Sequence, residues 1–188
     1  MQTILVKKRF GNEELGVQEF IRPNTHMVAK LADSFWSRSR TLNDYIERCW
    51  RFVLNGIHTP TGDLLTRDWH AMYAFHDKGS STPLAFYQAN DFWAFPSETL
   101  TTKIGDCDDK SILLVSLLRR YNVWAYATVG TFQGAGHMWV VAGRRNKVLE
   151  TTAPRPIEPE ATPYVPMFRF NERQVIQLRR LENTPLVV

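Results

Sequence analysis

Cys107 has the setting best suited to covalent chemistry, because it stands in the acidic stretch Gly105–Asp109 at the start of a helix-like segment. The dipole and the unpaired N–H groups of a helix N-terminus stabilise a thiolate. The flanking aspartates Asp106, Asp108 and Asp109 oppose it, so the thiolate needs a cationic partner. Inert cysteines usually have apolar neighbours, so this acidic setting favours a nucleophile.

His137 is the expected partner, because it opens a strand-like segment after the glycine-containing run 130–136. The turn that follows this segment predicts a hairpin in which Ala142 pairs with Lys147. In that register Glu150 is the diagonal neighbour of His137 on the same sheet face, roughly 7–8 Å away between backbones. A one-residue bulge would turn Glu150 to the other face. The three residues predict a Cys–His–Glu triad, in which the imidazole takes the thiol proton and the carboxylate orients the ring.

An acyl intermediate also needs a second oxyanion donor beside the Cys107 N–H, and an upstream segment is expected to supply it. Gln88, Asn90 and Trp93 are the candidates, and the sequence does not rank them.

The other cysteine and the upstream histidines have structural explanations. Cys49 falls on the apolar face of a helical pattern, which predicts a small buried core residue rather than a disulfide partner of Cys107. His58, His70 and His76 stand among aromatic and turn residues. The six-residue spacing of the last two matches no ordinary ligand pair, so we do not expect a metal site there.

Three helical segments are expected upstream of Cys107. The first begins near 24–25 and runs through residues 26–39, and the second runs over 41–56 with Thr41 as N-cap and Gly56 at its end. A short helical turn follows, with Ser97 as its cap.

The segment 106–122 predicts a fourth helix, apolar over most of its circumference and therefore buried at the centre of a domain. Asp106 is its expected N-cap, with Asp109 three residues later as in a capping box.

The remaining segments predict a sheet. Strands are expected over 2–10, 123–132, 137–143, 147–152 and 167–178, with the proline-rich segment 154–166 as an extended loop. Helices followed by antiparallel strands predict an α+β fold. The loop 131–136 and the loop after Ala153 are expected to wall a cleft between the central helix and the sheet.

The composition is that of one ordinary globular domain. The chain has 188 residues, of which 44% are hydrophobic and 22% charged, which excludes a collagen-like repeat, wholesale disorder and a membrane bundle. The net charge of +4 permits contact with nucleic acid but does not indicate it. No apolar run approaches the ~20 residues of a membrane span, and the N-terminal segment lacks the layout of a signal peptide. We therefore expect a cytoplasmic or virion-associated protein without a membrane span.

Three motifs resemble those of the transglutaminase-like superfamily, most closely its bacterial cysteine-proteinase branch. The first is a D-x-W-x-x-P-x-E-x-L lead-in that starts at Asp91, the second is the G-D-C-[DE]-D motif at Gly105–Asp109, and the third is an H-x-W strand at His137. The final acid of the pattern is often Asp, and here it is Glu150. The resemblance covers roughly residues 86–153.

This resemblance implies a papain-like α+β fold, with N-terminal helices and a central buried helix packed on an antiparallel sheet. It also implies thiol chemistry on an amide, with Cys107 at the head of the central helix and His137 and Glu150 on the sheet. In the bacterial branch, the acids beside the cysteine can hold calcium, and Asp106 and Asp108 occupy those positions here. No cofactor is expected to be required.

We expect a single domain over 1–188, with a helical part at 1–85, the motif core at 86–153, and the proline-rich loop and final strand at 154–188. A cysteine peptidase or amidase acting on a protein or peptide is the first hypothesis. A protein-glutamine acyltransferase with the same triad, and a catalytically idle module in a larger assembly such as a virus particle, remain alternatives. A transition-metal site is disfavoured, since three carboxylates and one thiolate are a poor zinc set. The sequence indicates no nucleic-acid partner and leaves the oligomeric state open.

Overall fold

The computed structural model describes residues 4–8, 13–59, 92–152 and 164–178. The helices are η1 (Val17–Phe20, a 3-10 helix), α1 (His26–Trp36), α2 (Leu42–Gly56), α5 (Pro96–Thr102) and α6 (Cys107–Arg120). The strands are β1 (Leu5–Lys8), β2 (Glu14–Gly16), β3 (Phe92–Trp93), β4 (Ala125–Phe132), β5 (Ala135–Ala142), β6 (Lys147–Leu149), β7 (Tyr164–Phe170) and β8 (Val175–Gln177).

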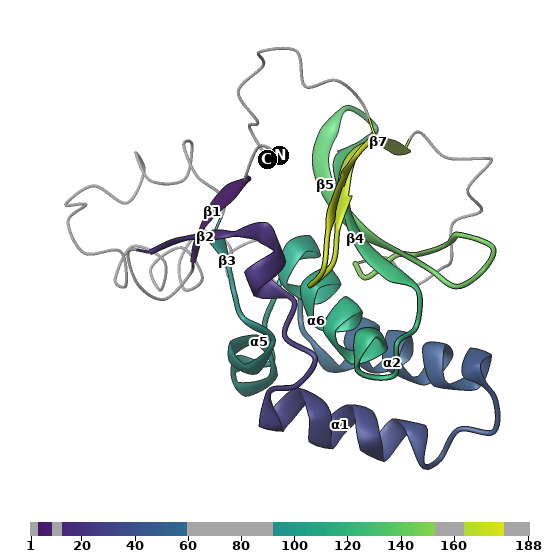
Figure 1. Cartoon of the computed structure of the whole chain (residues 1–188). Coiled ribbons are helices and arrows are strands. Elements are labelled where there is room, and N and C mark those ends of the chain that lie inside the picture. The colour runs from purple at the N-terminus through teal and green to yellow at the C-terminus, as the bar shows by residue number, and fades with distance from the viewer. Residues whose placement is uncertain (1–3, 9–12, 60–91, 153–163, 179–188) are drawn as a thin grey trace.

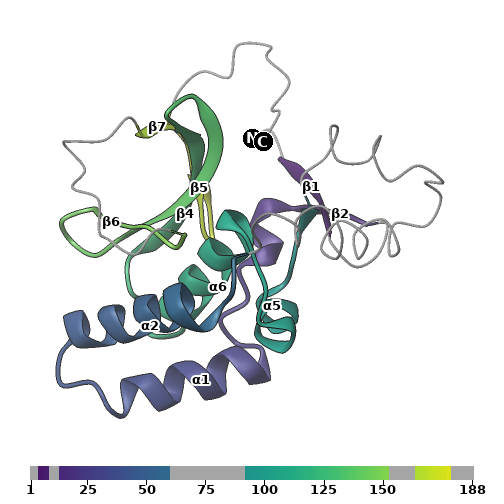
Figure 2. The ribbon, with the colours of Figure 1, turned by 180° about the vertical axis from the view of Figure 1, so that it is seen from behind.

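Helix α6 lies at the centre of the molecule, between the large sheet and the pair α1 and α2 (Figure 1; Figure 2 gives the view from behind). Its residues from Asp108 to Arg119 are buried, which agrees with the apolar circumference predicted from the sequence. The fold is α+β, as predicted, with helices packed on an antiparallel sheet. Among the described residues, no helix is long and apolar enough to span a bilayer.

The first two predicted helices are confirmed. Helix α1 has Thr25 at its N-cap, and the Thr41 Oγ1 atom caps α2 by accepting a hydrogen bond of 3.1 Å from the Asp44 N–H. Helix α2 ends at Gly56, as predicted. Cys49 on this helix is fully buried in the core, and it forms no disulfide with Cys107.

The predicted start of α5 is wrong. The N-cap is Phe95 rather than Ser97, and Pro96 occupies the first helical position. The Glu98 carboxylate reaches back and accepts a 2.6 Å hydrogen bond from the Phe95 N–H. Proline is preorganised for that position, and the glutamate supplies the half of a capping box in which the N3 side chain accepts from the N-cap N–H.

The large sheet has the order β6-β5-β4-β7-β8, and all its pairs are antiparallel. The β5–β6 register is the predicted one, with Ala142 opposite Lys147. The segment 131–136 is not the expected loop. It forms the ends of β4 and β5 and a two-residue turn, in which Gln133 and Gly134 have φ of 52° and 85°. Positive φ at both central residues is typical of the tight turn that matches strand twist.

The end of the described chain also differs from prediction. Residues 167–178 form two strands instead of one, because Asn171 Oδ1 accepts hydrogen bonds from the N–H groups of Arg173 and Gln174 and turns the chain between β7 and β8. Residues 164–166, expected in the proline-rich loop, open strand β7. The rest of that predicted loop lies outside the described residues.

A second, small sheet was not predicted. It has the order β2-β1-β3, and β1 pairs in parallel with β3, which follows it only after both α1 and α2. Strand β1 covers only part of the strand expected at 2–10. Through this small sheet, β3, which precedes α5 and α6 in the chain, lies beside the N-terminal strand β1 (Figure 1).

Candidate active site

Cys107 is the first residue of α6, half-buried against the hydrophobic core. Asp106 is at the N-cap position, and its carbonyl accepts a 3.1 Å hydrogen bond from the Lys110 N–H. Its side chain makes no capping hydrogen bond, contrary to the sequence prediction. Gly105 allows the tight entry to the helix, because a Cβ there would lie 2.8 Å from Asp109 Cβ.

The predicted capping box at Asp109 is also wrong. Its Oδ1 accepts a 2.8 Å hydrogen bond from the Ala94 N–H at the end of β3, a buried donor that would otherwise lack this partner. The Oδ1 atom of Asp108 accepts from the Asp109 N–H at 2.7 Å. Asp106, Asp108 and Asp109 each have a carboxylate oxygen within 4.8 Å of those of the other two. This group is called the acid cluster below.

Ser111 connects the first turns of α6 to the sheet. It stands four residues after Cys107, so both occupy the same side of the helix, with Cβ atoms roughly 5–6 Å apart. Its hydroxyl donates a 3.3 Å hydrogen bond to the Met138 carbonyl and lies 3.4 Å from Thr151 Oγ1. Met138 follows His137, and Thr151 follows Glu150. Ser111, one turn after Cys107, therefore contacts the residues that directly follow His137 and Glu150.

His137 and Glu150 are in direct contact, with 2.9 Å between His137 Nε2 and Glu150 Oε2. Within the described part of the chain, the carboxylate has four further donors: Oε1 accepts from the Thr151 N–H, the Thr152 N–H and the Thr152 hydroxyl, and Oε2 accepts from the Tyr164 hydroxyl. Burial alone would raise the pKa of Glu150. The hydrogen bond and charge of His137, with the Tyr164 and Thr152 hydrogen bonds, outweigh it and lower the pKa to about 2.

The ionised state of Glu150 fixes the histidine tautomer. A carboxylate only accepts hydrogen bonds, so the proton between the two residues belongs to His137 Nε2. In the neutral ring Nδ1 then has a lone pair and can accept a proton. The His137 ring is mostly enclosed, with 15% of its side chain exposed, and Glu150 is buried.

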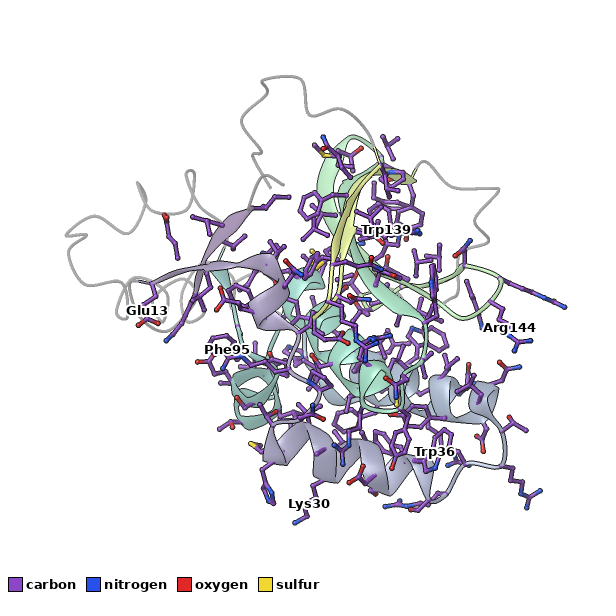
Figure 3. All side chains as sticks on the ribbon, in the orientation of Figure 1. Glu13, Lys30, Trp36, Phe95, Trp139 and Arg144 are labelled. Atoms are coloured by element: carbon purple, nitrogen blue, oxygen red, sulfur yellow. The ribbon has the colours of Figure 1, made fainter. Side chains whose placement is uncertain are left out.

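Tyr164 contacts this pair and was missed by the sequence reading, which assigned it to a loop. Its hydroxyl lies 2.6 Å from Glu150 Oε2, and its ring is nearly parallel to the His137 imidazole at 6.2 Å. Trp139 and Phe132 pack on the Tyr164 ring at 4.7 and 4.8 Å. Figure 3 shows Trp139 among the strands of the large sheet, far from Trp36 on α1. Pro166, two residues after Tyr164, could have indicated an irregular strand here, since proline inside a sheet is found at edge strands or bulges.

Lys110 is a buried cation beside the site that the sequence reading also missed. Its ammonium donates to Thr59 Oγ1 at 2.9 Å and to the Leu54 carbonyl at 3.4 Å. Burial lowers the pKa of Lys110 to about 8, against the attraction of Glu150 and Asp106.

The three predicted oxyanion donors have different outcomes. Gln88 and Asn90 lie outside the described residues, as do His70 and His76. Trp93 is buried in the core, stacked on Phe170 at 5.5 Å and edge-on to Phe20 at 5.4 Å. The catalytic roles of Cys107, His137 and Glu150 stay predictions.

The model of one protein family, described as the CEP76 peptidase-like domain, matches residues 91–162, which is less than half of the chain. Among solved structures, Legionella pneumophila LapG is similar over 81% of this chain and 76% of its own, with 17% identity and a TM-score of 0.56. The fold is that of the transglutaminase-like, papain-like peptidases.

Two further structures are similar at lower TM-scores. Calcium-bound Legionella pneumophila LapG gives 0.46 at 16% identity, over 89% of this chain and 94% of that one. A candidate cysteine protease from Cytophaga hutchinsonii gives 0.47 at 14% identity, over 84% of this chain and 51% of that one. No curated protein matches the sequence.

Proposed function

We propose that this protein is a cysteine peptidase or amidase that cleaves an amide bond through a thioester on Cys107. The observation that carries the proposal is the His137 Nε2–Glu150 Oε2 contact of 2.9 Å beside the first turns of α6. It leaves Nδ1 of the neutral ring as the base for a thiol at the head of that helix. The transglutaminase-like fold supports a peptidase-type enzyme at a coarse level.

In the proposed reaction, the Cys107 thiol first gives its proton to His137 Nδ1, and the thiolate Sγ then attacks the amide carbonyl carbon. The tetrahedral intermediate collapses as the imidazolium gives that proton to the leaving amine, which breaks the C–N bond and leaves a thioester. Water then attacks the thioester with His137 as base, releasing the acid and restoring the thiol. Glu150 keeps the ring oriented and stabilises the imidazolium in both halves.

The decisive experiment is the pH dependence of Cys107 alkylation in a Cys49→Ala background. We expect Cys107 to react as a thiolate well below the value of ~8.5 for a free cysteine, and His137→Ala to abolish this behaviour. His26→Ala, which removes an exposed histidine on α1, is the matched control and should change nothing. An ordinary thiol titration that does not respond to His137→Ala would refute the proposal. Two further assays then separate hydrolysis from acyl transfer. Cleavage of peptides indicates hydrolysis, and incorporation of a labelled amine into a glutamine-bearing protein indicates acyl transfer.

We further propose that the acid cluster holds calcium. Its donors are all carboxylate oxygens, which suit Ca²⁺, and Asp106 Oδ1 is a buried atom with no hydrogen-bond partner within the described part of the chain. Bound there, the ion would offset the negative charge that opposes a thiolate at Cys107. Calcium should then raise the unfolding temperature of the wild type more than magnesium does, and Asp106→Asn should remove the difference. An equal response of wild type and variant would exclude the site.

A further inference from the structure

The face of the sheet on which Tyr164 lies depends on an irregularity in β7. On β4, Ala125, Ala127 and Val129 belong to the hydrophobic core that surrounds α6. Side chains alternate along a strand, so Gly130 and Phe132 belong to the opposite face. His137 pairs with Gly130 and therefore shares that opposite face.

The irregularity is a one-residue bulge at Met167. Val129 is opposite Phe168, but its neighbour Gly130 is opposite Pro166, so Met167 has no partner on β4. Without the bulge, Tyr164 would keep the phase of Phe168 and point to the core. With it, Tyr164 pairs with Phe132 and lies on the face of His137. Bulges are enriched near active sites, where they redirect a side chain.

Gly130 makes room for this arrangement. A Cβ at Gly130 would lie 2.1 Å from the Val165 carbonyl oxygen and 2.8 Å from Trp139 Cη2. Any larger residue would push β7 away from β4 at the pair that precedes the bulge. The glycine and the bulge together thus set the approach of Tyr164 to Glu150.

The hydroxyl of Tyr164 acts as a donor in this contact. Burial, and then the hydrogen bond to Glu150, raise the pKa of Tyr164 far above its usual value, so the phenol stays protonated. Its proton therefore points to Oε2, the same oxygen to which His137 Nε2–H donates. The two donors share one oxygen, while the backbone and hydroxyl donors of residues 151–152 occupy the other.

We propose that Tyr164 is a positioning residue of the site, whose hydroxyl fixes Glu150 Oε2 against His137 and takes part of the negative charge of that oxygen. This inference rests on the proposed function, and it adds a fourth residue that acts through Glu150. Because the phenol draws charge from Oε2, it weakens the hold of the carboxylate on the imidazolium. The weaker hold on the imidazolium matters for a base that must give its proton to the leaving amine.

The test is an NMR titration of the His137 ring in the full chain, compared between wild type, Tyr164→Phe and Tyr126→Phe. Tyr126 lies on the same sheet, and its hydroxyl accepts a hydrogen bond from Gln174 Nε2. Tyr126→Phe therefore also removes one hydrogen-bonded hydroxyl, which makes it the matched control. Within the described residues, the titratable groups in contact with the ring are Glu150, which follows β6, and Tyr164 on β7, and the charge of Lys110 on α6 acts on Glu150. All of them remain in the control.

We expect Tyr164→Phe to move the midpoint of the His137 titration to higher pH by roughly half a pH unit, because the bare carboxylate holds the imidazolium more strongly. Tyr126→Phe should leave the midpoint in place. If Tyr164 only supported the fold, its loss would loosen the His137–Glu150 contact and move the midpoint to lower pH. An unmoved or lowered midpoint therefore overturns the proposal.

A second variant keeps the hydroxyl and covers the case in which Tyr164→Phe does not fold. Site-specific Tyr164→3-fluorotyrosine makes the phenol a stronger donor, so the His137 midpoint should move to lower pH. No movement in this variant also overturns the proposal. The ring titration does not require Cys107 to react, so a failed Cys107 alkylation test refutes the proposed enzyme without deciding the role of Tyr164.

Discussion

Replacing Glu150 with glutamine separates its charge from its shape. The amide oxygen can accept from the three donors of Thr151 and Thr152, while the amide NH2 can donate to Tyr164 Oη and to His137 Nε2. In Glu150→Gln every former partner of the carboxylate therefore still has a hydrogen bond to the side chain, although the Tyr164 O–H proton loses its acceptor and the NH2 group requires a bare Nε2. The His137 proton must move to Nδ1, the atom that should act as the base.

The energetic consequence depends on pH. Depression of the Glu150 pKa from its usual 4.5 to about 2 corresponds to about 3 kcal/mol of folding stability at neutral pH. Because the folded pKa is the lower one, this stability is present above pH 4.5 and is lost as the pH falls towards 2. Linkage puts the loss between pH 7 and pH 3 at about 2 kcal/mol. The glutamine variant does not have this loss.

Urea unfolding of wild type and Glu150→Gln between pH 7 and pH 3 measures the effect. The difference in unfolding free energy between the two proteins should shrink by about 2 kcal/mol over that range. Glu14→Gln, at an exposed position on β2, is the control and should show a constant difference. At pH 7 the Glu150 variant should also lose Cys107-dependent turnover by roughly 10³–10⁴-fold, the scale of a triad with the wrong tautomer. A constant difference for Glu150→Gln would refute the reasoning.

Two further predictions concern the cysteines and the bulge. Burial raises the pKa of Cys49 to about 12. Below pH 9, an alkylating agent should therefore label Cys107 alone in the native protein and both cysteines in urea. Mass spectrometry identifies the labelled sites, and equal labelling of both cysteines in the native protein would contradict the burial argument. Gly130→Ala should destabilise the fold by roughly 1–3 kcal/mol through overpacking and slow Cys107 alkylation. Gly143→Ala adds a Cβ into open space at a φ of 74° that strains any other residue, so it should also destabilise the fold but should not slow alkylation. Equal alkylation rates for the two variants would show that the approach of β7 does not matter.

The sequence was most informative where local periodicity decides the structure. The β5–β6 register followed from one pairing across a short turn, and it brought Glu150 towards His137 because no bulge interrupts that pair. The apolar circumference of α6 was enough to place it at the centre. These features depend on neighbours that are close in the chain.

The errors arise where a distant segment competes for a local group. Asp109 looked like part of a capping box, but the buried Ala94 N–H takes its carboxylate. Tyr164 looked like a loop residue because prolines surround it, and the bulge that brings it to Glu150 depends on the contact with Gly130. Neither partner is visible from the local pattern, so neither contact could be predicted from it.

The donors around Glu150 explain how a buried carboxylate can serve a histidine. Apart from His137, the donors that the described residues supply to it are backbone N–H groups and hydroxyls of Thr151, Thr152 and Tyr164, all of them neutral. The nearby cation, Lys110, hydrogen-bonds to residues of the 54–59 segment. A salt bridge to Lys110 would neutralise the carboxylate and leave little attraction for an imidazolium. Neutral donors keep the group ionised and spread its charge without cancelling the net negative charge, so the cation that gains most from it is the protonated His137 formed when a thiol gives up its proton.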